Sequence, residues 1–263
     1  MAERPAAQGD VPLRDGVIRW FDLFIAFFGG MFAGIVLGVI GALPAILIGL
    51  HWSGGPLDPQ TLADFARTDF AVNQVLLVGS NLGLLGLVWL VAHWRFDKPI
   101  THYFAVVRWP SLGLAIVAGA GLSLLLNGGN AMLERLSWVR FEDSDVERAM
   151  VPHGPAQLLA AIAVIGVLAP FVEEFFFRGL LFSWARRQWG TWIAVLATGA
   201  IFALVHGHFL LHVGAQAWIY TIELFVAGVV LALLVARTGS LRTSFAMHAA
   251  YNVTAIAFSV LLP

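Results

Sequence analysis

Seven long runs of apolar residues, separated by short polar stretches, make up most of the chain. A helix needs about 20 mainly apolar residues to cross a bilayer, and each run reaches that length. We therefore predict an all-α membrane protein, a polytopic bundle of seven or eight helices. The predicted spans are Leu23–Leu50, Phe70–Ala92, Leu112–Leu133, Ala156–Phe182, Trp192–Leu211, Ala217–Ala236 and Leu241–Leu262.

The first run is long and rich in glycine, and it contains Pro44. A proline removes a backbone donor from a helix, so this run is predicted to be tilted, kinked or broken into two pieces. Gly29, Gly30 and Gly34 are alternatively positions at which a second helix packs closely, because glycine lets two backbones approach each other.

Composition supports the membrane interpretation. The chain is 59% hydrophobic and 12% charged, whereas soluble domains are about 45–50% apolar and about 25% charged. The net charge of −1 gives no indication of a nucleic-acid partner, and the absence of cysteine excludes thiol catalysis, cysteine metal sites and disulfides. Residues 1–20 are predicted to be a polar tail, and residues 21–263 a single transmembrane domain.

Positive charges are divided unevenly between the two sides of the predicted bundle. Loops rich in lysine and arginine stay in the cytoplasm, so we predict a cytoplasmic N-terminus and a C-terminus on the opposite side. Ten positive residues then lie on the cytoplasmic side and four on the other. The ten are Arg4, Arg14, Arg19, Arg95, Lys98, Arg108, Arg186, Arg187, Arg237 and Arg242, and the four are Arg67, Arg135, Arg140 and Arg148.

Two adjacent acids and an arginine lie inside the fourth apolar run. Glu173, Glu174 and Arg178 follow a stretch, Leu158 to Val172, that carries no charge. A charged residue at a helix centre in a bilayer costs roughly 2.5–3.5 kcal/mol, so these side chains are expected to face a protein interior or a wet cavity. The i, i+4 spacing of Glu174 and Arg178 favours an ion pair. Glu173 is then left without this partner, which suits a general base or acid.

Two later runs each carry a pair of residues on one helix face. Phe202 and His206 are spaced i, i+4 in the fifth run, and His248 and Asn252 have the same spacing in the seventh. His248 and Asn252 can donate hydrogen bonds to a carbonyl oxygen that gains charge during a reaction, or they can hold helices together. The polar groups of the fourth, fifth and seventh runs predict a polar cavity between those helices.

The remaining polar residues of the apolar runs have no assigned chemistry. His208 and His212 miss the helix face of His206, and we predict interfacial histidines rather than ligands. The charged segment 134–155 is predicted to be a solvated surface loop, with or without a short amphipathic helix. Three isolated residues are predicted to pack between helices or to line the cavity, namely Gln216, Glu223 and Asn127.

The order of the three motifs resembles a known family. Glu-Glu-x-x-x-Arg, then Phe-x-x-x-His, then His-x-x-x-Asn is similar to the CAAX protease and bacteriocin-processing family, also called CPBP or Abi, which includes the type 2 CAAX prenyl proteases. The match covers residues 156–263. It implies an intramembrane endopeptidase of helical fold. The expected substrate is a lipidated or membrane-anchored protein or peptide, cut near its C-terminus or its membrane anchor within the lipid bilayer.

The resemblance also implies roles for individual residues. Glu173 would activate water with the help of His206, and His248 and Asn252 would stabilise the oxyanion. The supporting residues would be Glu174, Arg178 and Phe202.

A zinc site is the alternative. Glu173, His206 and His248 together form the two-histidine, one-glutamate set that binds some catalytic zinc ions. We favour a site without metal or other cofactor, because Asn252 is a poor zinc ligand and, as an oxyanion donor, takes a role that a metal would otherwise have.

Three other functions remain open on the sequence. One is an inactive immunity or scaffold relative that binds a peptide without cutting it. Another is an ion-coupled transporter, in which the intramembrane Glu, Arg and His residues form a proton path. The third is a lipid-modifying enzyme. The complete motif set disfavours the scaffold, and the lack of repeated halves disfavours the transporter.

Overall fold

A computed structural model describes residues 18–54, 56, 58–95, 107 and 109–261, and all regular secondary structure in these residues is helical. Seven helical segments are long and apolar enough to cross a membrane, which confirms the predicted all-α class and the seven spans. Large apolar side chains point outward, as Phe32 (70% exposed) and Leu125 (69% exposed) illustrate, so the protein is an integral, multi-pass membrane protein. The predicted N-terminal tail lies, up to residue 17, outside the described residues.

The predicted spans agree with the observed helices, apart from their ends and one break. The first span comprises α1 (Trp20–Phe24), η1 (Ile25–Gly29) and α2 (Gly30–Ser53), the second α4 (Phe70–Arg95), and the third α5 (Trp109–Arg135). The fourth comprises α7 (Pro155–Ala161), η3 (Ile162–Leu168), α8 (Ala169–Glu174), η4 (Phe175–Phe182) and α9 (Ser183–Trp189). The fifth comprises α10 (Thr191–Val205) and α11 (His208–Leu211), the sixth is α12 (Gly214–Thr238), and the seventh is α13 (Leu241–Leu261). Two short helices lie between spans, α3 (Pro59–Thr68) and α6 (Asp145–Met150).

The first span is continuous, with a π-helical turn at η1, and it packs closely against α4 through glycines. A Cβ added to Gly83 would lie 2.1 Å from the backbone nitrogen of Gly34, and one added to Gly79 would lie 2.3 Å from Cα of Gly38. Real Cβ atoms do not come this close, so only glycine permits the contact. The suggested packing role of Gly34 is thereby confirmed.

The fifth run contains the break. It was predicted as one helix to Leu211, but α10 ends at Val205, and Gly207 adopts a left-handed backbone with φ of +72°. Glycine is the usual residue for this conformation just past a helix end. The chain therefore turns directly after His206, and α11 begins at His208 in a new direction.

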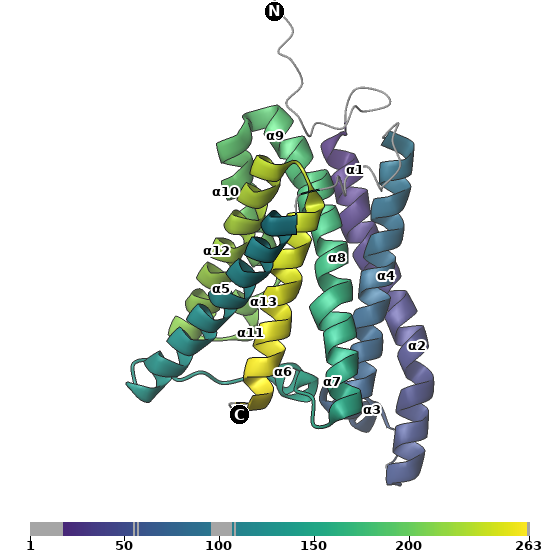
Figure 1. Cartoon of the computed structure of the whole chain (residues 1–263). Coiled ribbons are helices and arrows are strands. Elements are labelled where there is room, and N and C mark those ends of the chain that lie inside the picture. The colour runs from purple at the N-terminus through teal and green to yellow at the C-terminus, as the bar shows by residue number, and fades with distance from the viewer. Residues whose placement is uncertain (1–17, 55, 57, 96–106, 108, 262–263) are drawn as a thin grey trace, which may run out of the picture.

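The fourth span lies at the centre of the bundle. Figure 1 shows α8 between α4 on one side and α13 on the other, with α5 lying along α13. The largest core cluster surrounds η4 and includes Phe175, Phe176, Phe177 and, from α10, Phe202. This aromatic packing holds the π-helical turn that directly follows the two glutamates.

Candidate active site

A buried ion pair lies on the fourth span. Oε1 of Glu174 lies 2.8 Å from Nη1 of Arg178, and the two side chains are 0% and 1% exposed. The guanidinium also donates to the carbonyl of Gly228 on α12 and lies 4.5 Å above the ring of Phe202. The pairing expected from the i, i+4 spacing is present, and it neutralises two charges that a bilayer would otherwise exclude.

The same carboxylate holds a histidine of the seventh span. Nδ1 of His248 lies 2.9 Å from Oε1 of Glu174. An ionised carboxylate can only accept, so the imidazole donates its Nδ1 proton. This bond fixes the ring and turns its other nitrogen, Nε2, toward Glu173.

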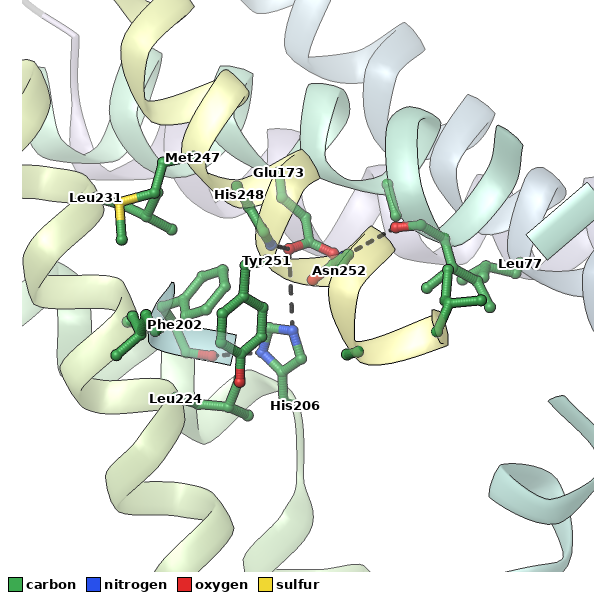
Figure 2. A pocket seen from close by; sticks show the side chains of 16 residues that line it. Leu77, Glu173, Phe202, His206, Leu224, Leu231, Met247, His248, Tyr251 and Asn252 are labelled. Atoms are coloured by element: carbon green, nitrogen blue, oxygen red, sulfur yellow. Dashed lines mark hydrogen bonds and ion pairs between the residues drawn. The ribbon is translucent and has the colours of Figure 1, made fainter. Parts of the chain in front are cut away.

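Glu173 lies between two histidines. Figure 2 shows its carboxylate directed toward both imidazoles. Oε2 lies 3.9 Å from Nε2 of His206 and 3.8 Å from Nε2 of His248. These distances exceed a hydrogen bond, and the Glu173 side chain is 22% exposed. Sequence reasoning left this carboxylate without an ion-pair partner. In the structure it is accessible and has two imidazole nitrogens within 4 Å.

The end of α10 sets the orientation of His206. Its Nδ1 lies 2.7 Å from the carbonyl oxygen of Phe202, one turn earlier. A carbonyl oxygen can only accept a hydrogen bond, so the imidazole is the donor in this contact. Nδ1 therefore carries the proton, and Nε2 presents a lone pair to Glu173.

The side-chain amide of Asn252 connects the seventh span to the fourth. Its Nδ2 donates to the carbonyl of Ile165, at 2.8 Å. Ile165 lies in the π-helical segment η3, in which the carbonyl would pair with the nitrogen five residues later. That residue is Pro170, which has no N–H. The amide of Asn252 satisfies the orphaned carbonyl and retains one further N–H.

The pocket at these residues has a volume of about 280 Å³. The expected helices, the fourth, fifth and seventh spans, contribute to it, and so do α4, α5 and α12. The expected polar character is confined to a minority of its lining, because most of the 16 residues are apolar. The polar residues are Glu173, His206, His248, Tyr251 and Asn252.

Sequence reasoning overlooked two features of this region. Tyr251 lines the cavity (Figure 2), and its position three residues after His248 is a signal that helical spacing could have used. A second pocket, of about 180 Å³, meets the first at Leu77, Glu173 and His206 and is lined in part by Asn81 of α4. Glu173 and His206 therefore border both pockets.

The most closely spaced potential metal ligands are not the three residues of the predicted zinc alternative. In the described residues, one group of histidines and carboxylates has ligand atoms within 4.8 Å of one another, and it consists of Glu147, His208 and His212. Glu173, His206 and His248 do not form such a group. The three residues have ligand atoms of suitable type, and Oε2 of Glu173 lies 3.9 Å from His206 and 3.8 Å from His248.

The three isolated polar residues have different partners, and one of them connects two helices. Glu223 on α12 accepts a hydrogen bond from Asn130 on α5 at 3.3 Å. Gln216 bonds the backbone of Glu142, and Asn127 donates within its own helix to the carbonyl of Ser123. The predicted packing between helices is therefore seen for Glu223, whereas Gln216 bonds an interhelical loop and Asn127 bonds its own helix.

Comparison with known proteins adds one finding. Residues 155–254 match the family model described as Rce1-like, type II CAAX prenyl endopeptidase. The matched range contains all three motifs and every predicted catalytic and supporting residue. No curated protein and no solved structure was found to match the chain.

Proposed function

Because residues 155–254 match the model of the Rce1-like type II CAAX prenyl endopeptidases, we propose that this membrane protein is a member of the CPBP family and an intramembrane endopeptidase of the glutamate type. It cuts a peptide bond near the C-terminus or the membrane anchor of a lipidated partner protein. The observation that carries the proposal is the accessible carboxylate of Glu173, which lies 3.9 Å from the free Nε2 of His206.

Water is the nucleophile. A water molecule between Glu173 and His206 can donate one hydrogen bond to the carboxylate and one to the imidazole lone pair. As its oxygen attacks the carbonyl carbon, Glu173 accepts the proton, and it later gives this proton to the departing amine. Such general-base catalysis contributes typically 10²–10⁴-fold to a rate. His206 orients the water through Nε2, because the hydrogen bond from its Nδ1 to the carbonyl of Phe202 fixes the ring.

His248 and Asn252 stabilise the oxyanion. The second N–H of Asn252 is not used by Ile165 and is available to the carbonyl oxygen. Nε2 of His248 carries a proton into the cavity only when the ring holds both protons, since Nδ1 already donates to Glu174. Glu174 and Arg178 thus position His248, and Phe202 packs against both catalytic imidazoles, with centroid distances of 4.6 and 5.7 Å.

The lining of the larger cavity suits an apolar substrate. Ligand pockets are mostly apolar with a few placed polar groups, and here the polar groups gather around Glu173. An apolar side chain or part of a lipid chain fits the cavity of about 280 Å³, while the adjoining pocket of about 180 Å³ receives the neighbouring peptide segment. We propose a prenylated protein as the substrate.

For the orientation of the chain in the membrane, we propose a cytoplasmic N-terminus.

No metal takes part in the proposed chemistry. Glu173 and His206 supply the base, and Asn252 with His248 supplies the oxyanion donors, so a Lewis acid has no remaining role. The alternative, zinc held by Glu173, His206 and His248, predicts instead that a chelator abolishes cleavage.

A comparison of C-termini tests the function. Proteomes of host cells that express the wild-type chain or its Glu173→Gln variant are compared by mass spectrometry of C-terminal peptides. We expect shortened C-termini of membrane-anchored proteins only with the wild type. Identical C-termini in both cells would contradict the proposal and favour a scaffold, a transporter or a lipid-modifying enzyme.

A further inference from the structure

A second cluster of potential ligands lies outside the candidate active site, where α6 meets α11. Oε1 of Glu147 lies 3.1 Å from Nε2 of His212 and 3.8 Å from Nδ1 of His208. The rings of the two histidines are parallel within 11°, and the ring of Tyr220 packs edge-on against both. Three ligand atoms from two separate segments thus converge on one point.

One histidine nitrogen of this cluster, Nδ1 of His208, makes no hydrogen bond. Nδ1 of His208 is buried and has no hydrogen-bond partner among the described residues. A buried polar atom without a partner is costly and calls for an explanation. A bound cation would supply the missing partner.

The local structure prepares Glu147 as an anion. Its Oε2 accepts the backbone N–H of Ser144 in the capping box that starts α6, which leaves Oε1 for the histidines.

We propose that Glu147, His208 and His212 bind a divalent cation of the zinc class. Zinc takes histidine nitrogens and carboxylate oxygens at about 2.0–2.2 Å, so the ligands of a tetrahedral ion lie roughly 3.3 Å apart. The distances of 3.1 and 3.8 Å bracket that value. Water completes the coordination, since three protein ligands leave a fourth position open.

Binding requires a change of tautomer at His212. Its Nδ1 accepts a hydrogen bond from Nε2 of Gln216, whose amide orientation is fixed by two bonds to the backbone of Glu142. In the metal-free protein Nε2 of His212 therefore carries the proton and donates to Glu147. The cation takes the place of that proton, which moves to Nδ1, and the bond from Gln216 is lost. Two hydrogen bonds of His212, with Gln216 and with Glu147, are exchanged for coordination at three ligands, including the unsatisfied nitrogen of His208.

The cation would tie two segments of the chain together near the candidate active site. α6 also contacts α4, where Nε2 of Gln74 lies 3.4 Å from the sulfur of Met150. α11 begins two residues after His206, and Figure 1 shows α6 and α11 in the same half of the bundle. A bound ion thus fixes the segment that connects the third and fourth spans to the end of α10. This inference does not depend on the proposed protease activity.

Zinc binding by the purified full-length chain, prepared without a polyhistidine tag and stripped of metal, provides the test. Calorimetric titration with zinc is carried out on the wild type, Glu147→Gln, His208→Ala and Glu173→Gln. His153→Ala is the matched control, because it removes an exposed histidine from the same interhelical segment. We expect one zinc per chain for the wild type, His153→Ala and Glu173→Gln, and at least about tenfold weaker binding for Glu147→Gln and His208→Ala.

Two results would overturn the site. One is the absence of stoichiometric zinc binding by the wild type. The other is binding that survives in Glu147→Gln and His208→Ala but is lost in Glu173→Gln, which would move the ion to the candidate active site. Hydrogen exchange on the wild type gives a readout that needs no variant. Zinc should slow exchange in residues 141–150, and unchanged exchange there would contradict the proposed link.

Discussion

The two adjacent glutamates should differ sharply in what they do for stability. Glu174 is fully buried and contacts Arg178 at 2.8 Å and His248 at 2.9 Å. Glu173 is 22% exposed and has histidine nitrogens only at 3.8 and 3.9 Å. Replacement of Glu174 by glutamine leaves the buried guanidinium of Arg178 without its counter-charge. Removal of one partner of a buried pair costs about 3–5 kcal/mol.

That energy is large enough to measure by thermal unfolding. A change of 1 kcal/mol shifts Tm by roughly 2–4 °C in chains of 150–250 residues, so Glu174→Gln should lower Tm by roughly 6–20 °C. Glu173→Gln should leave Tm within about 2 °C of the wild type and abolish turnover, because it loses a base but no short contact. Both are followed by intrinsic tryptophan fluorescence of purified protein in one detergent. An equal drop in Tm for the two variants would refute this division of labour.

Three further outcomes are expected. Gly83→Ala should lower Tm, because its Cβ would lie 2.1 Å from the backbone nitrogen of Gly34. Gly86 on the same helix faces open space, so Gly86→Ala should leave Tm unchanged or raise it slightly. Equal Tm values for the two variants would argue against the glycine contact. Asn252→Ala should lower the free energy of unfolding by about 1–3 kcal/mol and should abolish turnover. Adding Pro170→Ala to this variant restores a backbone donor for Ile165, so the double variant should regain stability but not turnover. Cleavage by the wild type should persist after exhaustive chelation, and activity that requires added zinc even in Glu147→Gln would instead place a metal at the candidate active site.

The spans were predictable because lipid exposure imposes a simple rule on composition. A run of about 20 apolar residues has few other uses, and the observed spans start and end near the predicted residues. The motif residues were also found from sequence, since charges within such runs need a protected position. The i, i+4 spacing of Glu174 and Arg178 was sufficient to predict their contact.

The break after His206 was not predicted, and it changed the interpretation of the next histidines. The helical-spacing argument for His208 and His212 assumed an unbroken helix, but the helix is interrupted at Gly207, which has a left-handed backbone conformation. Their contact with Glu147 joins residues more than 60 positions apart, and no local pattern indicates it. A glycine directly after a polar helix residue was the available signal.

The contact of Asn252 with the fourth span could not be predicted, because it depends on π-helical pairing, which helix propensities of single residues do not indicate. Its bond to Ile165 exists because η3 is π-helical, so that Pro170 stands where a backbone donor is needed. The proline is visible in the sequence, but the shift from α-helical to π-helical pairing is set by packing within the bundle. Tyr251 was overlooked for a simpler reason, since a tyrosine in an apolar run carries no charge.

Hydrolysis of a defined substrate by the purified chain tests the central claim most directly. Wild type and Glu173→Gln, both metal-stripped and shown to be folded, are reconstituted in lipid vesicles with a farnesylated peptide and an unprenylated twin. The reaction runs in water enriched in oxygen-18, with products identified by mass spectrometry. We expect the wild type to cleave the farnesylated peptide and to place one labelled oxygen in the new carboxylate, with at least about 100-fold less product from Glu173→Gln. Comparable cleavage by the folded Glu173→Gln variant would contradict the assignment of Glu173 as the base that activates water.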